Sequence, residues 1–263
     1  MEDAGKPLCR NAVIGDPEHA HVLLCAHYDT PSWRILPELV FPGHLAIEIL
    51  YQCIEVLLLF LIPSVLLMAA YRVLMQPRLS LLVFVIAFAI ELFLLQYGIP
   101  TRHHETGANA PLAVLLGVME QLPEDRRNRV AILLFDHGTT GSRGARAWCK
   151  THLKEMYTKL AVHVSVVGED ADIHLISGKE GKRASGYGTF KRVLKAKEDS
   201  RKMTLSRDDS SAFRCGVRLV TCSRMFSIPV VRHLRKESDR NVSDGRVQEM
   251  TREIIKCIES LGM

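Results

Sequence analysis

Two long apolar runs interrupt an otherwise charged chain. The first covers residues 56–71 and extends toward its N-terminus around Glu55, and the second covers residues 79–99 and contains only Glu91. About 20 helical residues, at roughly 1.5 Å per residue, cross the hydrocarbon layer of a bilayer. A short connection, residues 72–78, joins the two runs. The pattern therefore predicts a transmembrane helical hairpin.

The alternative for these runs is a pair of helices buried in a large soluble core. Soluble α/β domains seldom need two consecutive helices with so little polar face, which favours the membrane. We therefore expect residues 45–99 to form a hairpin inserted into one discontinuous domain, residues 1–44 and 100–263. Residues 1–15 contain no apolar signal run, and the residues flanking the hairpin are net basic. We expect a multi-pass membrane protein with two helices and a cytoplasmic globular domain.

Outside the hairpin, short apolar runs of strand length alternate with helical patterns. Continuous apolar strands are typical of a sheet that is covered by helices on both faces. Their alternation with helices predicts an α/β fold, a three-layer sandwich with a mostly parallel mixed sheet. The predicted strands are residues 21–26, 130–135, 160–167, 217–222 and 228–231, and the predicted helices are residues 110–122, 144–157, 187–197 and a last helix capped by Ser243 or Asp244.

Composition narrows the classes of function. The chain has a formal net charge of +5 and seven cysteines, none of them in a C-x-x-C pair. An odd number of scattered cysteines argues against a disulfide framework and against a cysteine zinc site. Residues 179–202 are basic, which suits either a solvated helix face or contact with anionic lipid. They lack the features of a nucleic-acid reader, so we expect no nucleic-acid partner.

Polar residues follow two predicted strands, where ligands gather in parallel sheets: His27 and Asp29 after the first, and Asp136 and His137 after the second. Four sequence blocks around and beyond them resemble, in order, those of the co-catalytic zinc aminopeptidase family. This family contains bacterial leucyl aminopeptidases, glutamate carboxypeptidase and the transferrin receptor. The four blocks are residues 23–31, 107–113, 135–144 and 206–213.

The resemblance implies a zinc-exopeptidase-like fold and a site with two zinc ions, a bridging aspartate and a glutamate base. It makes His27 the surviving metal-ligand position and Asp29 the residue that orients His27. The other expected positions carry residues that offer no such chemistry: Ala108 for the bridging aspartate, Gly138 for the base, Thr139 and Ser165 for two ligands, and residues 235–237 for the last histidine.

A single histidine does not hold zinc at cellular levels. The resemblance therefore implies a pseudopeptidase with no catalytic residue and no cofactor, in which His137 fills the vestigial site by hydrogen bonding. Its partners are expected to be the bilayer, through residues 45–99, and a protein or peptide bound by the domain. The alternative is an active membrane metallopeptidase or other hydrolase with a relocated zinc site, for example one formed by His27, Asp136 and His137. A transporter is disfavoured because two helices make no pathway by themselves.

Overall fold

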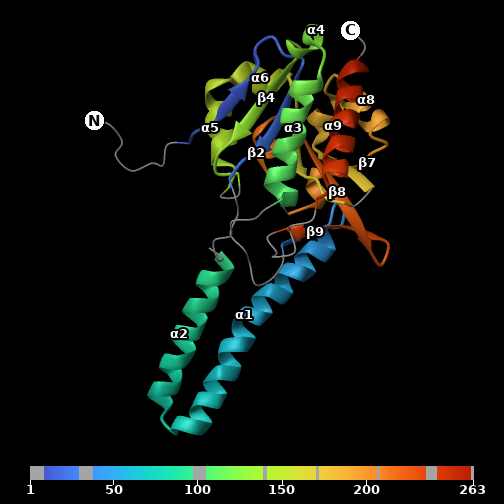
Figure 1. Ribbon diagram of the computed structural model, residues 1–263. Coiled ribbons are helices and arrows are strands. Elements are labelled where there is room, and N and C mark those ends of the chain that lie inside the picture. Colours follow the sequence, from blue (N-terminus) through green and yellow to red (C-terminus); the bar gives the residue numbers. More distant parts are fainter. Residues whose placement is uncertain are drawn as a thin grey trace, which may run out of the picture.

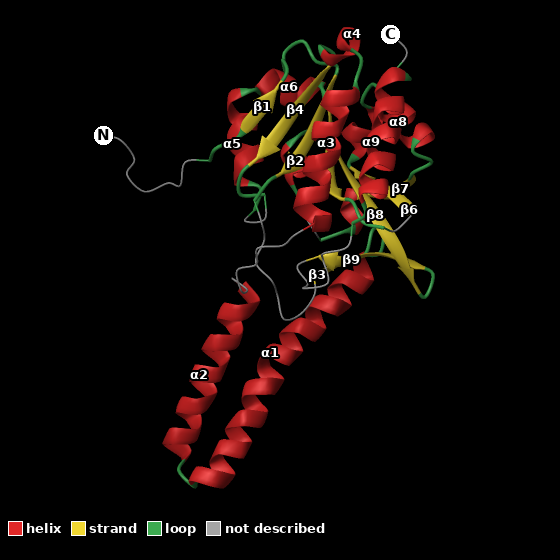
Figure 2. Cartoon of the chain, in the orientation of Figure 1, coloured by secondary structure: helices red, strands yellow, loops and turns green. Residues whose placement is uncertain are grey.

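A computed structural model describes residues 9–29, 38–96, 105–138, 141–169, 172–205, 208–234 and 242–261. Figures 1 and 2 show an α/β domain from which two long helices project together on one side. The predicted α/β class and the mixed sheet with a parallel centre are confirmed.

The sheet runs in the order β1-β4-β2-β5-β8-β6-β7, with β9 paired to β8 and β3 paired to β9. Its centre is parallel, from β4 through β2 and β5 to β8, whereas β1, β6 and β9 pair with antiparallel neighbours. The strands are β1 (Ala12–Ile14), β2 (Val22–His27), β3 (Glu38–Val40), β4 (Val130–Phe135), β5 (Leu160–Val166), β6 (Asp172–Ser177), β7 (Lys197–Ser200), β8 (Gly216–Met225) and β9 (Ile228–Leu234).

Helices cover both faces of this sheet. Successive residues of a strand point to opposite faces, so each central strand contributes side chains to both cores. In β2, Leu24 packs in the core beneath α3, α8 and α9, whereas Leu23 and Cys25 pack in the core beneath α5. The helices are α1 (Leu45–Leu74), α2 (Pro77–Gln96), α3 (Ala110–Gln121), α4 (Glu124–Arg127), α5 (Arg143–Thr151), α6 (Leu153–Thr158), α7 (Lys179–Arg183), α8 (Tyr187–Val193) and α9 (Asp244–Glu259), with short turns η1 (Glu105–Asn109), η2 (Arg201–Met203) and η3 (Asp209–Ala212).

Two helix predictions differ from the structure. The predicted helix 144–157 is divided into α5 and α6 at His152, whose backbone lies outside the helical region. The predicted helix 187–197 ends at Val193, and Lys195 then takes a positive φ of 49° before β7 begins. The last helix begins as expected, because the side chain of Ser243 accepts a hydrogen bond from the Arg246 N–H.

The hairpin consists of α1 and α2, which contact each other near the connecting turn and diverge toward the domain (Figure 1). Met75, with a φ of 54°, ends α1 in the left-handed conformation and turns the chain toward α2. Both helices are long and apolar enough to cross a membrane, and only 6% of each apolar window is buried. This exposure argues against helices buried in a soluble core. Residues 97–99, the end of the predicted hairpin, lie outside the described residues.

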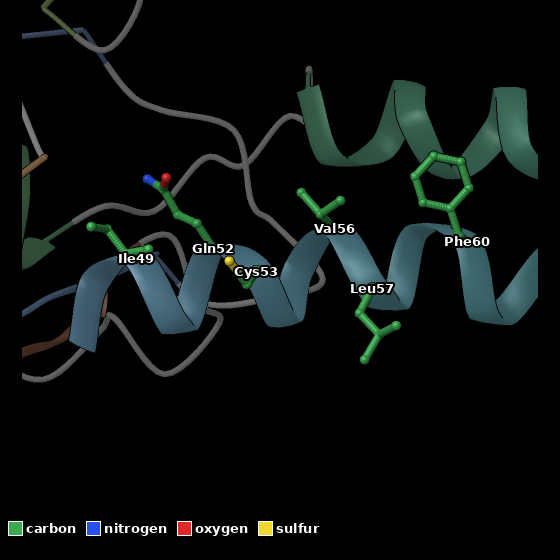
Figure 3. A pocket seen from close by; sticks show the side chains of 6 residues that line it. All are labelled: Ile49, Gln52, Cys53, Val56, Leu57 and Phe60. Atoms are coloured by element: carbon green, nitrogen blue, oxygen red, sulfur yellow. The ribbon is translucent and has the colours of Figure 1, made fainter. Parts of the chain in front are cut away.

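Glu48, in the first turn of α1, ties the hairpin to the domain. Its side chain is buried and accepts hydrogen bonds from the Phe41 N–H at 3.0 Å and the Thr204 hydroxyl at 2.7 Å, and also from the Leu205 N–H. Further along α1, Val56 and Phe60 lie on the side facing α2 (Figure 3). There an apolar groove of about 510 Å³ is lined by Ile49, Gln52, Cys53, Val56, Leu57 and Phe60.

Candidate functional site

A row of polar side chains lies on the α5 side of the sheet, at the carboxyl end of β2. His27 follows Cys25 at the strand's two-residue period, so it shares the face of Cys25. Cys25 pairs in register with His163 of β5, and His163 pairs with Arg218 of β8. The register therefore brings His27, His163 and Arg218 to one region from three strands that are far apart in the sequence.

Three side chains of types that can ligate a metal ion converge there: His27, His163 and Asp209. One potential ligand atom from each lies within 4.8 Å of the other two. Asp209 Oδ2 is 4.0 Å from His27 Nδ1 and 3.4 Å from His163 Nε2. His163 and Asp209 are buried, whereas the His27 side chain is 12% exposed. The cluster is therefore an interior site with one edge toward solvent.

Asp208 fixes the ring of His163. Its Oδ2 lies 2.6 Å from His163 Nδ1 and 3.4 Å from Arg218 Nε, and its Oδ1 accepts a hydrogen bond from the Ser210 hydroxyl at 2.6 Å. Burial alone would lower the pKa of His163, but the Asp208 and Asp209 carboxylates together outweigh it and raise the pKa to about 9. Burial would raise the pKa of Asp208, yet His163 and Arg218 hold it well below its usual range.

Because Gly138 has no side chain, there is room for His27 and Asp209 beside it. A Cβ at this position would lie 2.5 Å from His27 Cβ and 2.9 Å from Asp209 Oδ2. The Gly138 N–H donates a hydrogen bond to Asp29 Oδ1 at 2.9 Å, so Asp29 holds this turn against β2. The role of Asp29 as the residue that orients His27 stays a prediction.

Two other predicted positions are buried. Ser165 accepts a hydrogen bond from Arg218 Nε at 3.1 Å, so a guanidinium lies beside this position. Ala108, 2% exposed, lies in η1 directly before α3. Neither side chain offers a metal ligand that would add to the cluster.

His137 pairs with its neighbour Asp136 and is not part of the cluster. Its Nε2 is 3.6 Å from Asp136 Oδ2, and its backbone has a positive φ of 53°. The structure thus brings His27 together with His163 and Asp209, and not with the Asp136–His137 pair considered for a relocated site. Thr139 and residues 235–237 lie outside the described residues.

Sequence reasoning missed His163 and gave Asp209 no role. A signal for His163 was present, because it is a polar residue in the middle of the apolar run 160–167. Buried polar side chains in such a strand need a partner. The partner could not be named without the strand register and the path of residues 208–213.

A solved structure shows the same fold. The crystal structure of Porphyromonas gingivalis glutaminyl cyclase matches with a TM-score of 0.50 and 10% sequence identity, over 95% of this chain and 77% of that chain. No protein-family model matches the chain, and no curated protein does.

This match corrects the assignment to the co-catalytic zinc aminopeptidases, which was wrong as a family assignment: the structural likeness is to a glutaminyl cyclase. The motifs misled because they are strand ends and glycine turns, which many α/β sheets share at their carboxyl edge. The expected zinc-ligand positions were taken from that family, so the count of ligands missing from this chain has no basis without it. At this identity the likeness establishes a fold and no activity.

Proposed function

We propose that the protein is a membrane-anchored α/β domain that acts by binding a protein or peptide at the cytoplasmic surface of a bilayer. The observation that carries the proposal is the hairpin, whose two helices project from the domain (Figure 2). Most of their apolar side chains are exposed. Exposed apolar surface of this extent marks a membrane or protein interaction site. The groove in Figure 3 fits this placement, because acyl chains would cover it.

Gly138 limits which side chains can stand beside the cluster. The turn after β4 passes so close to His27 and Asp209 that even a methyl group at residue 138 would collide with them. A carboxylate base therefore does not fit beside His27 at this position.

The second candidate is a membrane hydrolase with a relocated metal site, and the cluster of His27, His163 and Asp209 favours it. A His₂-carboxylate set is a common arrangement in catalytic zinc sites. The fold neighbour, a glutaminyl cyclase, suggests peptides with an N-terminal glutamine as one substrate to test.

The test follows the full chain in cell membranes and then in purified form. We expect it to stay in the membrane pellet after alkaline carbonate extraction, and a protease added to sealed inside-out vesicles to digest the globular domain. Release by carbonate, or protection of the domain in these vesicles, would contradict the anchor or its orientation. Chelator-sensitive hydrolysis of aminoacyl peptides, abolished by His27→Ala in a folded variant, would favour the hydrolase, and cyclisation of N-terminal glutaminyl peptides with release of ammonia would favour a cyclase instead.

A further inference from the structure

Three polar atoms where His163 and Asp209 meet are buried and have no hydrogen-bond partner among the described residues. These atoms are His163 Nε2 and both carboxylate oxygens of Asp209, and each side chain is about 1% exposed. A buried carboxylate whose oxygens accept no hydrogen bond is expensive, and native structures nearly always satisfy such groups. An occupant that interacts with an imidazole nitrogen and a carboxylate oxygen together would remove this penalty.

The spacing of the ligand atoms fits a metal ion. Metal–nitrogen and metal–oxygen bonds of about 2.0–2.2 Å in a tetrahedral site place neighbouring ligand atoms about 3.3–3.5 Å apart. The distances from Asp209 Oδ2 are 3.4 Å to His163 Nε2 and 4.0 Å to His27 Nδ1. A shift of a few tenths of an ångström in the partly exposed His27 ring would bring the second distance into this range.

The surroundings of His163 have the form of a metal-bound histidine. Its Nδ1 lies 2.6 Å from Asp208 Oδ2, so a proton on Nδ1 is donated to the carboxylate and Nε2 is left to face Asp209. A carboxylate behind a ligating histidine fixes the tautomer and raises the basicity of the ring. Asp208 is in turn held by Arg218 and Ser210.

We propose that His27, His163 and Asp209 bind one divalent transition-metal ion of the zinc class. Two imidazoles and one carboxylate select such an ion over magnesium or calcium, which prefer oxygen ligands. Three protein ligands leave a fourth position for water or a ligand. The ion enters beside His27, whose side chain forms the exposed edge of the cluster. This site goes beyond membrane anchoring and does not require that the protein turn over a substrate.

The experiment uses the full chain in detergent, stripped with a chelator and then loaded with Zn²⁺ or Co²⁺. We expect one ion per chain by elemental analysis, and an intense visible Co²⁺ spectrum typical of a tetrahedral nitrogen–oxygen site. Asp209→Asn keeps the shape of the side chain and removes its charge, so it should weaken Co²⁺ binding by at least about a hundredfold. His27→Gln, at the exposed edge, should weaken it similarly and serves if Asp209→Asn does not fold.

His174→Gln is the matched control. His174 is equally buried, its Nδ1 lies 2.6 Å from Asp199 Oδ2, and its Nε2 also lacks a hydrogen-bond partner, but it is not part of the cluster. We expect this variant to keep the Co²⁺ affinity and spectrum. A stripped wild-type chain that takes up no ion, or an affinity unchanged by Asp209→Asn and His27→Gln, would overturn the proposal. The structure would then hold a protonated His163 between Asp208 and Asp209. Because the readout is bound metal, its failure is separate from failure of the membrane anchor.

Discussion

At the scale of single residues, the absence of a side chain at Gly138 allows the turn after β4 to lie directly against His27 and Asp209. The turn after β4 passes over the end of β2, held by the hydrogen bond from the Gly138 N–H to Asp29. The cluster therefore depends on a residue that contributes no chemistry of its own.

Gly138→Ala tests this dependence. The added methyl group would lie 2.5 Å from His27 Cβ and 2.8 Å from His27 Cγ, so the turn or the strand must move. Overpacking of this kind costs about 1–3 kcal/mol, and we expect a matching fall in the free energy of unfolding by denaturant titration. Gly188→Ala is the control, because a Cβ at Gly188 meets no atom within 4 Å. An equal loss in both variants would contradict the steric explanation.

At the scale of elements, the buried carboxylate of Glu48 links α1 to the domain, beside the ring contact of Tyr51 with Phe41. Glu48 accepts hydrogen bonds from Phe41, Thr204 and Leu205, which lie on segments on either side of the hairpin's first turn. A negative charge in the first turn also interacts favourably with the helix dipole. The orientation of the hairpin on the domain therefore depends strongly on this side chain.

Glu48→Ala should loosen this junction. Each buried donor left without an acceptor costs about 1–3 kcal/mol. We expect faster hydrogen exchange at Phe41 and Leu205 and faster proteolysis between the domain and α1, with little change in the sheet. Gln52→Ala, one turn further along α1 at an exposed position, is the control. Unchanged exchange in Glu48→Ala would show that other contacts hold the helix.

A second element-scale link joins α7, α8 and β7 through Glu198. Its carboxylate lies 2.6 Å from Lys182 Nζ and 2.7 Å from Lys191 Nζ. The hydrogen bonds from Lys182 and Lys191 lower the pKa of Glu198 to about 2. A carboxyl whose pKa is depressed in the folded state stabilises the fold above its unfolded pKa, near 4.5, and loses that contribution as the pH falls toward 2.

Glu198→Gln should therefore lower the melting temperature at pH 7, and the difference from wild type should shrink below about pH 4. The side chain is 28% exposed, so solvent limits the effect to about 1 kcal/mol or less. Melting curves of both proteins across this pH range give the measurement. Glu253→Gln removes an exposed pair with a single lysine, Lys256, and should have a smaller effect. A Glu198→Gln difference that is constant with pH would contradict the ion-pair explanation.

At the scale of the whole molecule, the hairpin and the domain are nearly separate structures. The buried clusters that fill both faces of the sheet contain no residue of α1 or α2. The two helices of the hairpin contact each other, for example through Phe60 and Phe88 with 5.5 Å between ring centroids. The sheet therefore does not need the hairpin for its core.

Replacing residues 53–96 by a flexible linker of about 15 residues should leave a folded domain, because the entropic cost of closing a loop rises only slowly with its length. We expect a cooperative melt within a few degrees of the full chain in detergent, and solubility without detergent. The variant keeps Glu48, so the junction of the first turn is unchanged. A non-cooperative melt would show that the hairpin contributes to the core.

Local pattern alone predicted most of the elements, for physical reasons. The hairpin was visible because a membrane span requires a long apolar run, and the strands at 130–135 and 160–166 were visible because a covered sheet requires continuous apolar residues. The strands β6 and β7 were not predicted because charged and polar residues interrupt their apolar pattern, although only β7 lies at the edge of the sheet. The break at His152 was not predicted, because the residues on both sides of it have a helical pattern.

The sequence by itself thus determined the fold class and the apolar hairpin, since both follow from the order and period of apolar residues. Only the tertiary structure decided the site. His27 was found at a strand end, but His163 joins it through the register of β2 with β5, and Asp209 through the packing of η3 on α5 and the sheet. These contacts join residues far apart in the chain, and register and packing leave no mark in any one segment.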